Sequence, residues 1–273
     1  MIFVDSHVHI YDCFDVDLLL DAALNNFQKA AKQYNSTGYP STYVLLLTEG
    51  KNEHWFKRSL ATLESTNQGN GNISKNWRVV KKEASDSLMV FRNDSLETAI
   101  YLVAGRQVVT KERIEVLALY TQQVIRDGRS LAETVDIIMK ANAIVVLPWG
   151  VGKWFGARGK IIQSLLSAQS RVKVYLGDNG GRPGLWPRPT LFRLVEKKGV
   201  AVLPGTDALP LKSETCRAGS FGFYLDDSLS QEEDPIKHLK NVLLSQSTPM
   251  SPFGHLQKNS LFLFNQLRLR LSS

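Results

Sequence analysis

The sequence is poor in cysteine: Cys13 and Cys216 are the only two among 273 residues. Two cysteines cannot form a disulfide framework, and this scarcity is typical of proteins kept in a reducing compartment. The sequence also lacks an apolar run long enough to span a bilayer, and the charge at Asp5 comes too early for a signal peptide. We therefore expect a soluble, cytoplasmic protein with no membrane partner.

Three further features are missing: a repeat of fixed period, a low-complexity tract and a glycine-rich dinucleotide fingerprint. What is present is 43% hydrophobic residues, enough for one large core, and we expect residues 1–273 to form a single domain. The net charge of +7 and the pI of about 9.3 permit an acidic substrate such as a phosphate ester, or loose nucleic-acid contact, but the charge is dispersed and proves neither. We expect a small anionic substrate as the partner and do not expect nucleic acid.

Apolar runs and amphipathic segments alternate along the chain. The runs at 41–47, 143–148 and 199–204 are typical of strands covered on both faces, and helical segments separate them. This alternation predicts an α/β fold with a parallel sheet and crossover helices. Residues 64–95 interrupt it as a loop and β-hairpin excursion, and residues 246–273 add a C-terminal helical extension.

The first predicted strand carries two histidines, His7 and His9, at its end. Side chains alternate along a strand, so these two imidazoles share one face, about 7 Å apart along the strand, and can bind a single metal ion or two neighbouring ones. The alternative is a pair of partly buried histidines that are satisfied by hydrogen bonds.

Polar, glycine-rich segments follow several strands, and they carry a second set of candidates. We expect this set to bind an anionic substrate, because arginine gives bidentate contacts to phosphate or carboxylate and a helix start also favours anions. The alternative is scattered surface charge. The candidates are Lys153, Arg158 and Lys160, beside Trp149 and Trp154, together with Asp178, Asn179 and Arg182.

The order of motifs resembles one known group, the polymerase and histidinol phosphatase (PHP) family of metal-dependent hydrolases. The likeness lies in Asp-Ser-His-Val-His at 5–9, Gly-Arg-Gln at 105–107, Glu-Val-Leu-Ala-Leu at 115–119 and Gly-Thr-Asp-Ala at 205–208. The resemblance implies a distorted (β/α) TIM-like barrel with its active site at the strand ends. It also implies a divalent ion, which would be zinc, manganese or iron.

Carried over residue by residue, the resemblance makes His7, His9 and Asp207 metal ligands. Glu115 stands where the family has a histidine and can still bind a metal, whereas Gln107 replaces a glutamate. Tryptophan at 149 and leucine at 209 replace two further histidines, so a trinuclear site looks dismantled. We expect one ion on the three matching residues, with Glu49 or Glu115 supplying a further oxygen.

These residues predict hydrolysis of a small anionic substrate, such as a phosphoester. Asp207 and Lys153 are the expected catalytic residues: Asp207 would orient a metal-activated water or accept its proton, and Lys153 would stabilise negative charge. The alternative function is a catalytically inactive PHP-like barrel that binds a ligand or a partner.

Overall fold

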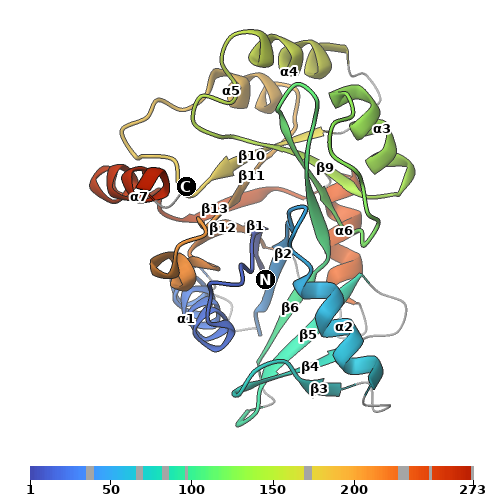
Figure 1. The fold of residues 1–273 in the computed structure, drawn as a ribbon, viewed down its shortest axis with the longest axis vertical. Coiled ribbons are helices and arrows are strands. Elements are labelled where there is room, and N and C mark those ends of the chain that lie inside the picture. Colours follow the sequence, from blue (N-terminus) through green and yellow to red (C-terminus); the bar gives the residue numbers. More distant parts are fainter. Residues whose placement is uncertain are drawn as a thin grey trace.

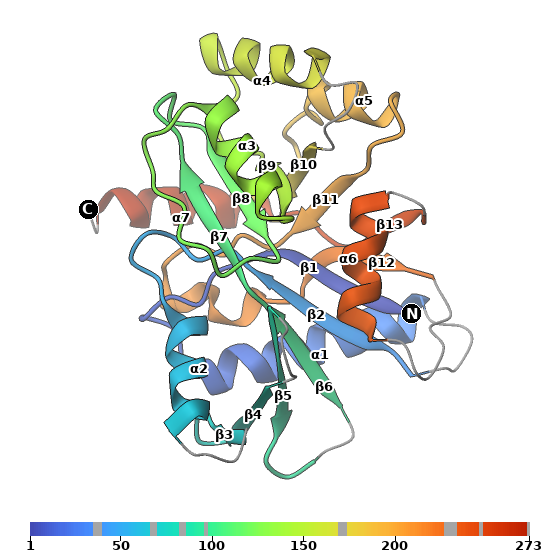
Figure 2. The ribbon, with the colours of Figure 1, turned by 90° about the vertical axis from the view of Figure 1, so that its right-hand side faces the viewer.

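The computed structural model describes residues 1–34, 40–65, 70–81, 86–95, 98–168, 174–226, 234–245 and 248–271. It shows an α/β fold in which helices surround two mixed sheets (Figures 1 and 2). The helices are α1 (Val16–Tyr34), α2 (Trp55–Ser65), α3 (Leu131–Lys140), α4 (Ala157–Ala168), α5 (Thr190–Glu196), α6 (Pro235–Ser245) and α7 (Asn259–Leu271), with a short 3-10 helix at Lys212–Arg217. The strands are β1 (Ile2–Val8), β2 (Thr42–Leu47), β3 (Asn70–Asn72), β4 (Trp77–Lys81), β5 (Ser87–Arg92), β6 (Ala99–Val103), β7 (Gly105–Val109), β8 (Glu115–Leu119), β9 (Ile144–Pro148), β10 (Val174–Asn179), β11 (Val202–Gly205), β12 (Phe221–Leu225) and β13 (Met250–Gly254).

The first sheet has the strand order β13-β12-β1-β2-β6-β5-β4-β3, and the second has the order β11-β10-β9-β8-β7. Parallel pairing is confined to β1-β2-β6 and to β9-β10-β11. Helices α1, α4 and α5 make the crossover connections that such parallel neighbours need.

The expected mostly parallel barrel needs correction, because the described strands form two separate ladders and no closed barrel. The physical reason lies in the middle of the chain. Within the described part of it, no helix lies between β4 and β8, so β4-β5-β6 and β7-β8 pair as antiparallel neighbours. Strands β3 to β5 extend the first sheet; residues 66–69 and 82–85 of the expected excursion lie outside the described residues, as do 246–247 and 272–273 of the expected extension.

The two sheets share an apolar cluster, and backbone contacts between described residues also join them on both sides of it. Glu49 and Arg106 form a parallel bridge where β2 and β7 approach each other. On the other side β11 lies against β1, where the Asp207 N–H donates to the His7 carbonyl at 2.8 Å. A Cβ on Gly205 would lie only 2.4 Å from the backbone nitrogen of His7, so this approach requires glycine. These contacts bring the carboxyl ends of β1 and β11 together.

A register shift in β1 decides where its side chains point. The pairing with β2 is irregular between Asp5 and Val8. Before the shift Phe3 packs into one apolar cluster; after it Val8 and Ile10 belong to that same cluster. The shift therefore reverses the alternation, and His7 and His9 face the opposite side, toward the second sheet.

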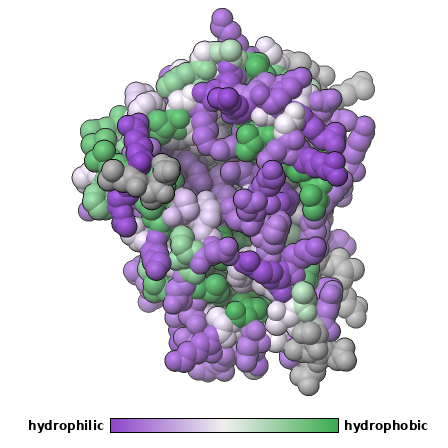
Figure 3. Space-filling model, viewed as in Figure 1, coloured by the Kyte–Doolittle hydropathy of each residue, from purple (hydrophilic) through white to green (hydrophobic). Residues whose placement is uncertain are grey.

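The surface in Figure 3 is mostly hydrophilic, with hydrophobic side chains gathered over α7 at the left edge. Leu263, Phe264 and Leu267 of this helix are 62%, 54% and 60% exposed. Among the described residues, no helix has both the length and the apolar composition needed to cross a membrane.

Candidate metal centre

Three side chains converge at the junction of β1 and β11. The Nε2 atoms of His7 and His9 lie 3.2 Å apart, and Oδ1 of Asp207 lies 3.4 Å from the first and 3.7 Å from the second. A tetrahedral ion with bonds of 2.0–2.1 Å would place its ligand atoms roughly 3.3 Å from one another. The arrangement fits one divalent ion with an open position.

Asp207 is held by its backbone and by a neighbouring strand. Its φ of 45° lies in the left-handed region, which a short polar side chain tolerates better than most. The Asn179 amide, at the end of β10, donates to Oδ2 of Asp207. That contact leaves Oδ1 facing the histidines.

A fully buried carboxylate, Asp5, ties the β1 end to the loop that carries Asp207. It accepts hydrogen bonds from Thr206 N at 2.9 Å, Thr206 Oγ1 at 2.6 Å, Gly219 N at 2.9 Å and His7 N at 3.3 Å. Burial raises the pKa of Asp5 to about 6, against the opposing effect of these donors. Asp5 thus fixes the spacing between the histidines and Asp207.

Glu53 fixes the orientation of His9. Its carboxylate accepts a hydrogen bond from Nδ1 of His9 at 2.9 Å, which assigns the proton to Nδ1 and leaves the Nε2 lone pair toward the cluster. Burial alone would lower the pKa of His9, but the hydrogen bond and charge of Glu53 outweigh it and the pKa is raised. For His7, burial dominates and the pKa is lowered.

Two further neighbours complete the surroundings. Tyr11 stacks on His9, with ring centroids 5.0 Å apart and planes within 9°. Burial, followed by the charges of Asp207 and Glu53, raises the pKa of this phenol, so it stays neutral. The side-chain oxygen of Gln107, on β7, lies 3.2 Å from Nε2 of His7.

The other two residues expected as metal ligands do not join the cluster. The Glu49 carboxylate accepts the Phe56 N–H at 2.6 Å and lies 3.4 Å from Arg106, so it stabilises the start of α2 and the seam between the sheets. Glu115 pairs with Lys153. Its charge opposes the lowering effect of burial on the pKa of both histidines, after larger contributions from burial and closer partners.

The expected substrate-binding residues lie in different parts of the structure and do not form one group. Lys153 is half-exposed and pairs with Glu115. Arg158 donates to the Gly152 carbonyl at 2.8 Å and so braces its own loop, while Lys160 is exposed on α4. No contact of either residue with the histidines is seen among the described side chains.

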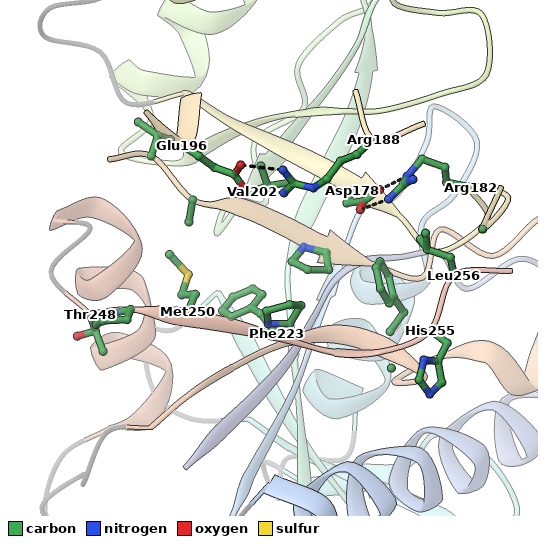
Figure 4. A pocket seen from close by; sticks show the side chains of 18 of the residues that line it. Asp178, Arg182, Arg188, Glu196, Val202, Phe223, Thr248, Met250, His255 and Leu256 are labelled. Carbon is green, nitrogen blue, oxygen red and sulfur yellow. Dashed lines mark hydrogen bonds and ion pairs between the residues drawn. The ribbon is translucent and has the colours of Figure 1, made fainter. Parts of the chain in front are cut away.

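Asp178 and Asn179 face opposite sides of β10, as alternation along a strand requires. Asn179 reaches Asp207, whereas Asp178 forms two hydrogen bonds of 2.8 Å with Arg182. This ion pair lines a different pocket, of about 900 Å³, which also holds the Arg188–Glu196 pair (Figure 4). The expectation that Arg182 lies with the histidines is therefore not met.

Sequence reasoning missed Asp5, Glu53 and Tyr11 as functional neighbours. Glu53 could have been predicted, because it lies in the loop that follows β2 and polar residues in such loops are candidates for a site at the strand ends. Tyr11 continues the two-residue spacing of His7 and His9. The role of Asp5 depends on Thr206 and Gly219, about two hundred positions away, and no local pattern reveals it.

No protein-family model matches this chain, and no curated protein matches it. Among solved structures, PsfC from Pseudomonas syringae PB-5123 is similar to it, with a TM-score of 0.52 and 14% identity over 99% of this chain and 98% of that one. At this identity the likeness concerns the fold alone, which the two chains share over nearly their whole lengths.

Two endonuclease structures are also similar. Endonuclease Q in complex with a 27-mer duplex substrate has a TM-score of 0.47 and 10% identity over 89% of this chain, and the lesion-specific PfuEndoQ from Pyrococcus furiosus has 0.49 and 12% over 92%. The chain spans 56% and 58% of the lengths of those two chains. The duplex complex contradicts the expectation that nucleic acid is not a partner, and that exclusion is withdrawn.

Proposed function

We propose that this chain is a PHP-like, metal-dependent phosphoester hydrolase that uses a single divalent ion. The observation that carries the proposal is the convergence of His7, His9 and Asp207, whose ligand atoms all lie within 4.8 Å of one another. Two histidines and one carboxylate are a donor set suited to zinc, manganese or iron. When bound, the ion would supply a polarised water able to attack an ester.

The chain's own residues would prepare this site. Glu53 keeps Nδ1 of His9 protonated, and Asn179 holds one oxygen of Asp207 so that the other is free. Asp207 can orient the attacking water or accept its proton. Lys153 sets an ammonium group beside the cluster, where an anionic substrate and the charge that develops on it would be stabilised.

The converging donors favour the hydrolase over the alternative, a catalytically inactive barrel. Without an ion, two buried imidazole nitrogens face each other at 3.2 Å, and only one proton can lie between them. If the cluster were purely structural, apolar side chains in the same space would stabilise the fold more, because buried polar groups are costly unless fully satisfied. The two facing nitrogens therefore favour a retained metal site.

Metal analysis of protein purified without a histidine tag tests the proposal. After dialysis against zinc, manganese or iron, we expect near one equivalent of bound metal, as for one three-ligand site. Hydrolysis would be assayed on a phosphomonoester, a phosphodiester and a short DNA duplex. His9→Ala should lose metal and hydrolysis together, because water activation depends on the ion.

The matched control is His255→Ala, which removes an exposed histidine from the pocket in Figure 4. It should keep both metal and activity. Wild-type protein that is folded by circular dichroism but takes up no metal would contradict the proposal, and so would a His9→Ala variant with unchanged metal content.

A further inference from the structure

A cleft lined by aromatic side chains lies beside the candidate metal centre. Its volume is about 400 Å³, within the range of small-molecule sites. The residues come from the loop after β9, from the loop after β10 and from the start of α5. The lining includes Trp149, Trp154, Phe155, Trp186 and Leu191.

The rings in this cleft are arranged as a fixed inner wall with an open rim. Trp149 is only 5% exposed and meets Trp186 at 6.1 Å, with the planes inclined by 64°. Trp154 packs edge-on against the buried ring of Phe192. At the rim Phe155 is 62% exposed and lies nearly parallel to Trp186, at a centroid distance of 6.4 Å. These faces can stack on another flat ring.

The cleft is joined to the metal centre through one side chain. The Asn179 amide donates to the Trp149 carbonyl at 3.4 Å and to Oδ2 of Asp207. Both lining loops follow carboxyl ends of the parallel strands β9 and β10, at the edge where β11 delivers Asp207. Lys153, in the first loop, reaches Glu115 beside the histidines. The backbone of one wall residue, Trp149, and Asp207 thus share a hydrogen-bond donor at the same edge of the sheet.

Two basic side chains accompany the cleft, each beside a carboxylate. Arg188 is part of the lining and pairs with Glu196, and Lys153, in the loop that supplies Trp149 and Trp154, pairs with Glu115. The cleft itself is lined mainly by rings and prolines, which offer stacking faces and few hydrogen-bonding groups. We propose that it binds a flat aromatic or heteroaromatic ring attached to the substrate's phosphate. This assignment rests on the proposed function and names its substrate class: phosphoesters with an aromatic group.

Binding of two non-hydrolysable probes, phenylphosphonate and cyclohexylphosphonate, tests the assignment by calorimetry. The probes have the same charge and similar size, but only the first has a π face. Stacking on aromatic side chains should make the first bind about tenfold more tightly. Phe155→Ala should bring the ratio close to one. It should not unfold the chain, since this side chain is largely exposed.

The control is Leu185→Ala, which removes a side chain that is 83% exposed, lies next to Trp186 in sequence and is absent from the lining. It should preserve the preference. Equal binding of the two probes to the wild type, or a preference that survives in Phe155→Ala, would overturn the assignment. Metal content and hydrolysis of a saturated alkyl phosphate are measured on the same samples. Absence of bound metal and of hydrolysis, with the preference for phenylphosphonate intact, would refute the proposed hydrolase function but not the aromatic ring site.

Discussion

The Glu53 carboxylate lies on the far side of the His9 ring from His7, and it binds Nδ1 at 2.9 Å while Nε2 faces the cluster. This contact makes the ligand set more than a coincidence of three side chains, because a carboxylate on the distal nitrogen orients a metal-binding imidazole and increases its basicity. Glu53 contacts Nδ1, the nitrogen that would not bind the ion, so it can be substituted without removing a metal ligand.

Substitution of Glu53 should weaken metal binding, to a different extent in two variants. Glu53→Gln keeps an acceptor but removes the charge, and Glu53→Ala removes both. We expect the alanine variant to bind zinc about 10–100-fold more weakly and the glutamine variant to lie between it and the wild type. Competition with a chelator measures these affinities. Glu64→Gln, an exposed change on the helix α2 that follows the loop of Glu53, is the control. Identical affinities in all variants would show that Glu53 has no part in the site.

Replacing Gly205 should damage both stability and the metal site. An alanine Cβ would lie 2.4 Å from His7 N and 2.5 Å from its Cβ, and backbone atoms cannot move aside cheaply. We expect Gly205→Ala to lower the free energy of unfolding by about 1–3 kcal/mol or more, as overpacked sites do. Urea unfolding and a zinc titration measure the two effects. Gly184→Ala, whose new Cβ would meet its nearest atom only at 4.0 Å, should leave both nearly unchanged.

Asp5 should make stability fall as pH rises through mildly acidic values. Its pKa is raised from 3.8 to about 6, so between these values the folded chain holds a proton that the unfolded chain releases. Its contribution is therefore greatest below pH 3.8 and is lost as pH rises to about 6, by about 3 kcal/mol in total.

The Asp5 contribution can be separated from that of other carboxylates by comparing the wild type with Asp5→Asn. The free energy of unfolding of both proteins is measured at intervals between pH 4 and 7. The variant should lack the Asp5 component of the slope, although it will be less stable throughout, because an amide cannot accept from all four donors. Parallel curves for the two proteins would assign the pH dependence to other groups.

The core of the site could be predicted from local sequence. Histidines two residues apart on an apolar strand select His7 and His9, and the Gly-Thr-Asp after a later strand selects Asp207 through its resemblance to the PHP motif. These signals are local because strand alternation and strand-end loops are local rules. The fold class followed from the same alternation of apolar runs and helices.

The rest depends on contacts that the sequence does not display. The register shift in β1 turns His7 and His9 toward the second sheet, and no residue in 5–8 is specific to such a shift. The division into two ladders falls between β6 and β7, which follow each other closely in the chain but belong to different sheets. The antiparallel pairing of β7 with β8 is equally hidden, because the apolar pattern of β8 also fits a parallel strand. Alternation puts Asp178 and Asn179 on opposite faces of β10, but the face that turns toward Asp207 and the pairing of Arg182 with Asp178 depend on contacts that the sequence does not display.

The candidate ligands come from different layers of the molecule. His7 and His9 belong to the end of a strand in the first sheet, whereas Asp207 follows the edge strand of the second. An ion shared by all three would thus act as a mechanical brace across the seam. The Asp5–Thr206 bonds, the Asp207–His7 backbone bond and an apolar cluster shared by both sheets hold the layers together without it. The ion would therefore add a local tie at the strand ends that carry its ligands, and its loss would loosen those ends while the two layers stayed packed.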